Sequence, residues 1–138
     1  MSRFVVDASL VLTWCFPDEN SPIADKIANM FRQGDSAMAP AFWPHEVINA
    51  LLVGEKRKRI SHAQTKIFLT DLSTLPVELR LFSGQDVFDH VQALSREYGL
   101  TAYDAAYLHL AEVSALPLAT LDGDLQDACK LAGVPLVD

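Results

Sequence analysis

Short apolar segments alternate with helical patterns along the whole chain, and this alternation limits the possible folds more than any other feature. Five short segments have the apolar character of buried strands: Arg3 to Val6, Ala37 to Ala41, Val77 to Phe82, Leu118 to Leu121 and Val134 to Val137. Amphipathic helical patterns lie between them: Ser9 to Phe16, Pro22 to Arg32, Pro44 to Arg57, Ser61 to Ser73, Gln85 to Tyr98, Ala102 to Ser114 and Asp124 to Leu131. Short strands separated by helices predict an α/β fold with a mostly parallel sheet, helices on both faces and right-handed crossovers. Ligands of such sheets bind beyond the carboxyl ends of the strands.

The length and composition predict a single globular domain over residues 1–138. Half of the 138 residues are hydrophobic and 21% are charged, and no linker, repeat or low-complexity tract divides the chain. Its apolar stretches are too short for a membrane span, and the N-terminus has no cationic region leading into a signal core. We therefore expect a soluble cytoplasmic protein, in which the widely spaced Cys15 and Cys129 are reduced thiols.

The net charge of -7 argues against simple electrostatic attraction to nucleic acid, which a basic surface would normally favour. A nucleic-acid function is therefore compatible with this chain only if the acids have a special arrangement. Their positions relative to the predicted strands decide the question.

Four carboxylates are predicted to meet at one edge of the sheet. Asp7 directly follows the first strand and Asp122 directly follows the strand that begins at Leu118, so the direction of the strands places both at the carboxyl edge. Glu46 lies in the first turn of the helix that leaves the second strand, and this helix begins at the same edge. Asp104 lies in the first turn of a helix that ends just before Leu118 and runs antiparallel to that strand. Its first turn therefore also reaches the carboxyl edge.

Each acid taken alone also has a structural explanation. Asp7 and Asp122 have the position of helix caps, and Thr101 with Asp104 has the spacing of a capping box, although Glu or Gln is usual at its last position. Taken singly, capping is the simpler interpretation. Glu46 fits it poorly, because the helix face that it occupies is too apolar to be simply solvated.

A metal site explains the four acids together. Clustered carboxylates repel one another and hold protons unless a cation neutralises them, and hard oxygen ligands suit Mg²⁺ or Mn²⁺. Divalent ions in such a site activate water and stabilise the leaving oxygen of a phosphodiester. The charge of the site then favours phosphate in spite of the acidic chain.

Four segments around these acids resemble the signatures of PIN domains. They are Val5 to Ser9, Pro44 to Leu51, Leu100 to Tyr107 and Ala119 to Leu125. In order and spacing they resemble the VapC toxins of bacterial toxin-antitoxin pairs. The resemblance covers essentially the whole chain, including the last predicted strand.

The resemblance implies a three-layer α/β/α sandwich with a five-stranded parallel sheet in the order 3-2-1-4-5. It also implies a magnesium-dependent endoribonuclease, with Mn²⁺ as a possible substitute, that leaves 5'-phosphate and 3'-hydroxyl ends and has a cognate antitoxin as partner. Four residues match the acidic positions that bind metal and carry catalysis: Asp7, Glu46, Asp104 and Asp122.

Other residues match polar neighbours of the family's site. Ser9 and Asn49 match positions that hold the carboxylates or metal-bound water, and Thr120 matches a position that is usually Ser or Thr. All three are expected to support the acids and not to bind the metal themselves. Asp124 is a further acid beside Asp122, and the sequence leaves open whether it contacts metal or only orients water. Lys56 to Arg59 form a basic run that either guides an RNA backbone or simply ends a solvated helix.

Two further expectations concern histidines and assembly. The four histidines, His45, His62, His90 and His109, lack the spacing of two histidines four residues apart on a helix, and we interpret all four as structural or exposed. The helices after Ser9 and Pro44 carry more apolar residues than one core-facing stripe requires, which favours a homodimer.

Three other functions compete with a toxin nuclease. A phosphotransfer domain also places acids at strand ends. However, a dehalogenase-like phosphatase would need an Asp where the chain has Ser9, and a receiver domain would need an acidic pair at the first strand. A non-catalytic binding module would not need the intact acid quartet. A PIN nuclease of RNA processing is the nearest alternative, and an antitoxin gene immediately upstream would distinguish the toxin from it.

Overall fold

The computed structural model of the chain describes residues 2–16 and 18–138. At its centre is a parallel sheet with the strand order β3-β2-β1-β4. The strands are β1 (Arg3–Val6), β2 (Ser36–Pro40), β3 (Val77–Arg80) and β4 (Leu118–Ala119). Val5 in β1 pairs with Met38 on one side and Leu118 on the other, so β1 occupies the middle of the sheet. Its Phe4, Val5 and Val6 are fully buried, as expected for a strand covered on both faces.

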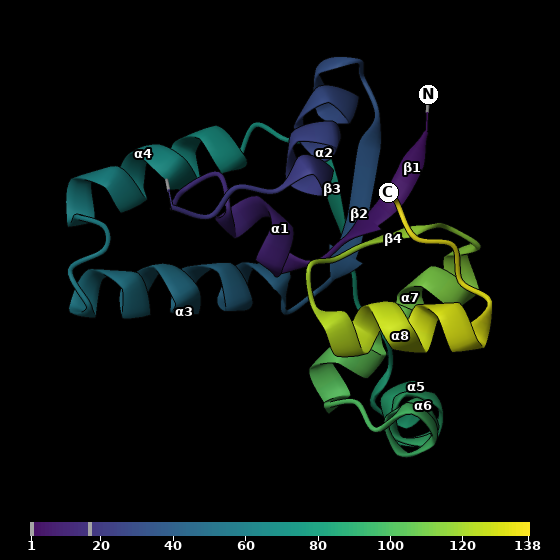
Figure 1. Cartoon of the computed structure of the whole chain (residues 1–138). Coiled ribbons are helices and arrows are strands. Elements are labelled where there is room, and N and C mark those ends of the chain that lie inside the picture. The colour runs from purple at the N-terminus through teal and green to yellow at the C-terminus, as the bar shows by residue number, and fades with distance from the viewer. Residues whose placement is uncertain (1, 17) are drawn as a thin grey trace.

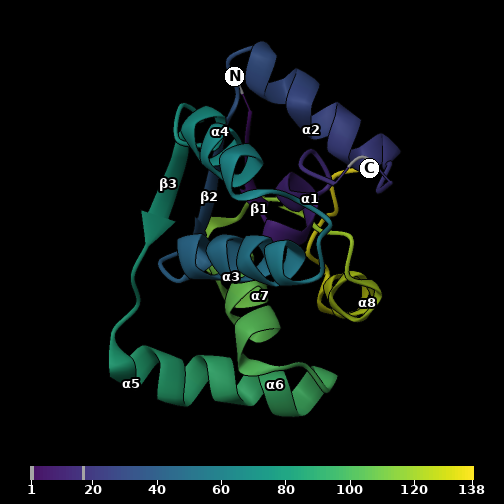
Figure 2. The same cartoon turned by 90° about the vertical axis from the view of Figure 1, so that its left-hand side faces the viewer.

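Helices cover both faces of this sheet, as the alternating pattern predicts. They are α1 (Ala8–Leu12), α2 (Pro22–Arg32), α3 (Trp43–Lys56), α4 (His62–Leu72), α5 (Gly84–Asp86), the π-helical η1 (Val87–Val91), α6 (Gln92–Tyr98), α7 (Ala102–Ser114) and α8 (Gly123–Ala132). In Figures 1 and 2, α3 and α4 lie on one side of the sheet and α7 lies on the other. Helix α7 contacts β1, β2 and β4, and every residue from Ala105 to Ala111 is buried. The predicted α/β/α sandwich is therefore confirmed.

The predicted count of five strands is wrong for the described residues, which form a sheet of four. The segment 134–137 contributes only an isolated parallel bridge between Leu136 and Leu118. The backbone N–H of Leu118 donates to the Pro135 carbonyl and that of Val137 donates to the Leu118 carbonyl, both at 2.9 Å. Pro135 has no N–H to extend the ladder, and β4 itself has only two residues. The segment still lies beside β4, where the predicted strand order places it.

Several predicted elements are shorter than their sequence patterns. The first helix ends at Leu12 instead of Phe16, because Thr13, Trp14 and Cys15 bond to carbonyls three residues earlier instead of four. The third and fourth strands end at Arg80 and Ala119, before the predicted Phe82 and Leu121. Strand β3 ends where its partner β2 ends at Pro40.

The predicted helix over 85–98 is continuous in space but not regular. It begins as α5, passes through η1 and continues as α6 along one side of the molecule (Figure 2). π-Helical turns are rare in proteins, and those that do occur are often found at functional sites.

Within the described residues, the longest and most apolar helices are still too short or too polar to cross a bilayer.

Candidate active site at the carboxyl edge of the sheet

Asp7 is buried at the point where β1 ends and α1 begins, with 7% of its surface exposed. One carboxylate oxygen accepts hydrogen bonds from the hydroxyls of Thr120, at 2.6 Å, and Ser9, at 3.0 Å. The other accepts a 3.5 Å bond from the Ser9 backbone N–H, so Asp7 also caps α1. Burial raises the pKa of Asp7, and the charge of Asp122 adds to this effect. The bonds from Thr120 and Ser9 oppose it without cancelling it.

Asp122 follows β4 across a short connection and caps α8. Its carboxylate accepts the backbone N–H of Asp124 at 2.9 Å and that of Leu125 at 3.4 Å. The Thr120 hydroxyl that donates to Asp7 also accepts the backbone N–H of Asp122 at 3.0 Å. Ser9 makes a second link of the same kind, because its hydroxyl accepts the backbone N–H of Leu121 at 3.3 Å. Both hydroxyls therefore join the end of β1 to the end of β4.

Glu46 lies in the first turn of α3 and is held by Tyr107 of α7. The Tyr107 hydroxyl donates to Glu46 Oε1 at 2.5 Å and accepts the backbone N–H of Ala8 at 3.4 Å. Burial and the charge of Asp7 raise the pKa of Glu46, while the tyrosine bond partly offsets them. Tyr107 itself is completely buried, and burial with the nearby acids raises the pKa of its hydroxyl. The hydroxyl therefore stays protonated and acts as a hydrogen-bond donor.

Tyr107 is a site residue that the sequence reasoning did not single out. It lies within one of the family-like segments, and it follows Asp104 by three residues on the same helix. Residues with this spacing share one helix face, and that signal places Tyr107 beside the acids. The spacing of residues along the chain does not predict that the Tyr107 hydroxyl donates a hydrogen bond to Glu46.

Asp104 joins the other acids from the first turn of α7. Its backbone N–H donates to the Thr101 hydroxyl at 3.1 Å, so the Thr101 half of the expected capping box is present. Burial, a hydrogen bond with Asp122 and the charges of Asp122, Asp7 and Glu46 together raise the pKa of Asp104 to about 7. The structure therefore brings all four predicted acids close enough to interact. Helix capping and convergence are both true of Asp7 and Asp122, whereas Asp104 converges with them on a helix that Thr101 caps.

Two of the predicted supporting residues lie at the rim. Asn49 is exposed one turn after Glu46 on α3. Both residues line a shallow depression together with Phe42 and Tyr103. Asp124 is exposed at the start of α8, where its backbone N–H contacts Asp122. The side-chain roles of Asn49 and Asp124 remain predictions.

The donor set fits a hard divalent cation. The four acids offer only carboxylate oxygens, and no Lys or Arg of the described residues forms an ion pair with any of them. Three of the four carry raised pKa values, which shows that negative charge is costly there without a cation. Mg²⁺ or Mn²⁺ would supply the missing positive charge.

A depression of about 800 Å³ leads away from these acids. Ser9 and Asp122 line it, and so do Arg57 and Arg59 from the predicted basic run. Arg59 lies over the Phe16 ring, with its guanidinium carbon 4.3 Å from the ring centroid, and pairs with Asp18 at 3.1 Å. The depression is therefore lined by both acidic and basic side chains.

Replacing Tyr107 by phenylalanine tests how Glu46 is positioned. The variant keeps the ring but removes the donor to Glu46 and the acceptor for Ala8. We expect a loss of metal-dependent activity of roughly tenfold to a hundredfold, as for partners that orient a metal ligand. Added Mg²⁺ should restore part of it if the Kd for the ion is what changes. Tyr98→Phe, at a tyrosine of α6 outside the site, is the matched control and should keep wild-type activity. Equal activity of Tyr107→Phe and wild type at limiting Mg²⁺ would contradict this positioning role.

The chain is similar to known proteins over most of its length. The sequence model of the PIN domain family matches residues 4–131. The chain is 30% identical over 125 residues to ribonuclease VapC3 of Pyrobaculum aerophilum, an alignment that covers 91% of this chain and 93% of that protein.

Two solved structures have the same fold. A crystal structure of a Pyrobaculum aerophilum protein has a TM-score of 0.68 and 22% identity, covering 92% of this chain and 84% of that one. A toxin-antitoxin complex from Klebsiella pneumoniae has a TM-score of 0.55 and 20% identity over 86% of both chains.

Proposed function

The chain belongs to the PIN-domain family, and from this premise we propose that it is a metal-dependent endoribonuclease acting as the toxin of a VapBC-type toxin-antitoxin pair. The observation that carries the proposal is the convergence of Asp7, Glu46, Asp104 and Asp122. Burial and the charges of neighbouring acids raise the pKa values of Asp7, Glu46 and Asp104. These four residues would hold Mg²⁺ or Mn²⁺. The bound ion supplies Lewis acidity at the phosphodiester and lowers the pKa of water.

The chain's own residues prepare the site for this chemistry. Thr120 and Ser9 hold the Asp7 carboxylate in one orientation by hydrogen bonds from two directions. Tyr107 does the same for Glu46. Because both carboxylates are held before an ion or substrate binds, little reorganisation is needed during the reaction.

The RNA would approach along the depression next to Asp122. Arg57 also lines it and offers a cationic group to the phosphate backbone, whereas Arg59 is paired with Asp18 and Glu19. Local positive charge of this kind is the proposed answer to the acidic net charge. Phosphate contacts of this kind position an RNA without selecting its sequence. The choice of cleavage site would then depend on other contacts.

The antitoxin is proposed to inhibit by placing a cationic side chain near the four acids. The support is electrostatic, because these acids have no Lys or Arg partner among the described residues. A cationic side chain of a partner protein would neutralise the negative charge of the four acids, as the metal ion would. A structure of the complex with the acids left open to solvent would contradict this mode of inhibition.

The decisive experiment is brief induction of the chain in a bacterial host with mapping of new 5'-phosphate RNA ends. We expect growth arrest, discrete new ends, and relief of both by co-expression of the protein encoded immediately upstream. Discrete cleavage of purified RNA without growth arrest would support the alternative, a PIN nuclease of RNA processing. Soluble, abundant protein that produces neither arrest nor cleavage would favour a non-catalytic PIN-fold module.

A homodimer is a further prediction of the proposed function. Leu52 and Val53 on α3 are 48% and 37% exposed, consistent with apolar residues beyond those that the core requires. Symmetric association would cover such residues. Multi-angle light scattering at micromolar protein should give twice the chain mass of 15.2 kDa. A stable monomer under these conditions would refute the dimer.

A further inference from the structure

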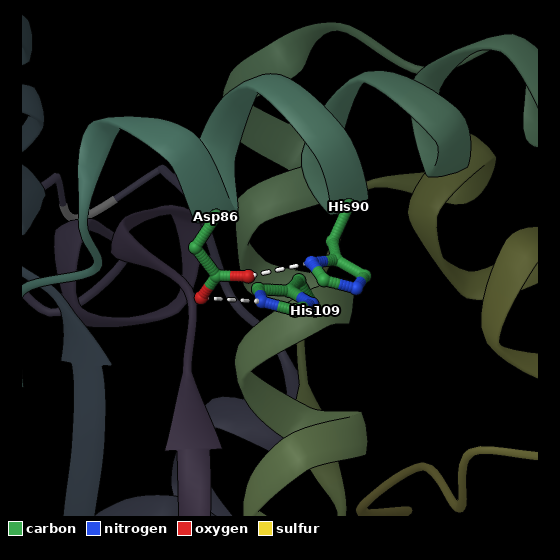
Figure 3. A group of neighbouring side chains, drawn as sticks. All are labelled: Asp86, His90 and His109. Carbon is green, nitrogen blue, oxygen red and sulfur yellow. Dashed lines mark hydrogen bonds and ion pairs between the residues drawn. The ribbon is translucent and has the colours of Figure 1, made fainter.

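A second group of metal-binding side chains lies away from the four carboxylates. Asp86 ends α5, His90 follows four residues later within η1, and His109 reaches them from α7 (Figure 3). One potential ligand atom from each residue lies within 4.8 Å of the others. From the sequence, all four histidines are expected to be structural or exposed, because no two of them lie four residues apart on one helix. The group instead combines an Asp and a His four residues apart on one helix, Asp86 and His90, with His109 from another helix.

The two histidine side chains converge on one carboxylate. Asp86 Oδ1 lies 2.7 Å from His90 Nδ1, and Asp86 Oδ2 lies 3.3 Å from His109 Nε2. The two rings are stacked at 8° with centroids 5.4 Å apart, so both present a nitrogen to the same side (Figure 3). Two imidazoles and a carboxylate are a common ligand set of late transition metals.

The distances are close to those that such an ion needs. Zinc bonds of about 2.0–2.2 Å in tetrahedral geometry place neighbouring ligand atoms roughly 3.3 Å apart. The contact between Asp86 and His109 already has this length, whereas that between Asp86 and His90 must open slightly. The His90 side chain is 66% exposed and can shift, while that of His109 is 7% exposed and held in the core. The site therefore combines one fixed ligand with one adjustable ligand.

The group is separate from the proposed catalytic centre. His109 follows Asp104 by five residues on α7, which turns it about 140° around the helix axis. Its neighbours are the Phe82 ring, with centroids 4.7 Å apart, and the η1 turn. Zinc ligands from both helices would fasten the α5–η1–α6 helix to the outer side of α7.

We propose that Asp86, His90 and His109 form a second metal site, which binds Zn²⁺ or a similar late transition-metal ion and holds η1 against α7. Each imidazole turns a lone pair to the ion, so its proton occupies the other ring nitrogen. A solvent molecule completes the coordination on the exposed side of His90. The proposal does not depend on nuclease activity, because it concerns binding and stability only.

The test is a zinc titration of the full-length, chelator-stripped protein by isothermal calorimetry in excess Mg²⁺, which occupies the carboxylates. We expect one Zn²⁺ per chain. His90→Gln should weaken its binding by roughly a hundredfold or more, since even the loss of an outer partner of a ligand costs up to about that factor. The exposed position of His90 makes this variant compatible with folding.

Two control variants locate the ion. His62→Gln removes an exposed histidine that lies 3.8 Å from Glu55, and it should leave zinc affinity unchanged. Asp104→Asn weakens the carboxylate centre and should also leave it unchanged. Nitrogen-detected spectra of the histidine rings should show His90 and His109 shifting with zinc, while His62 does not. Absence of zinc binding, equal affinity of wild type and His90→Gln, or loss of binding in Asp104→Asn would each overturn the proposal.

Discussion

The Asp104→Asn variant is expected to lose RNA cleavage by at least about a hundredfold while remaining folded. Asparagine keeps the size of the side chain and leaves intact the bond from the Asp104 backbone N–H to Thr101. It removes one of four mutually repelling carboxylates. Burial, together with the interactions of the other three, raises the pKa of Asp104 to about 7. Metal-free stability should therefore stay level or rise. In this variant, RNA cleavage should therefore fall while the free energy of unfolding of the metal-free protein does not.

Melting curves with and without Mg²⁺, run beside cleavage of total RNA, distinguish these effects. Mg²⁺ should raise the Tm of the wild type more than that of the variant, because the variant has the larger Kd for the ion. Asp127→Asn on α8 is the matched control, since it removes an exposed acid outside the site. A fully active Asp104→Asn variant, or wild-type cleavage that persists in excess EDTA, would rule out the metal mechanism.

The metal-free protein is expected to become less stable as the pH rises from about 4 to about 7. The pKa of Asp104 is about 7 in the folded chain, above its ordinary value of 3.8, so the folded state binds this proton more tightly than the unfolded state does. The resulting stabilisation is complete below the ordinary pKa and is lost as the pH rises through about 7. The raised pKa values of Asp7 and Glu46 act in the same direction.

Mg²⁺ should reverse this trend. The ion competes with protons for the carboxylates, so its affinity and the Tm increase that it causes should grow with pH. Melting curves across the same pH range, in EDTA and in Mg²⁺, measure both effects. Asp104→Asn should flatten the EDTA curve between about pH 4 and pH 7, which assigns that part of the slope to Asp104. A wild-type EDTA curve parallel to that of Asp104→Asn would show that Asp104 does not hold a raised pKa.

The sequence was sufficient for the architecture and for the identity of the acids. Strand and helix patterns predicted the parallel sheet, and strand direction placed Asp7 and Asp122 at one edge before any contact was known. The boundaries were less predictable. Val134 to Val137 has the composition of a strand, yet only one bridge forms, because strand pairing depends on the partner's free N–H and carbonyl groups as much as on local pattern.

What the sequence alone determined about this protein is therefore the fold class and four carboxylates at one edge. Tertiary structure decided how these carboxylates are held. Thr120 contacts Asp7 across 113 residues, Tyr107 contacts Glu46 across 61, and Asp86 meets His109 across 23. Periodicity specifies which face a side chain occupies, but not which distant face is packed against it. The hydrogen bonds that orient Asp7 and Glu46, and the meeting of two histidines at Asp86, arise only when the helices pack on the sheet and on one another.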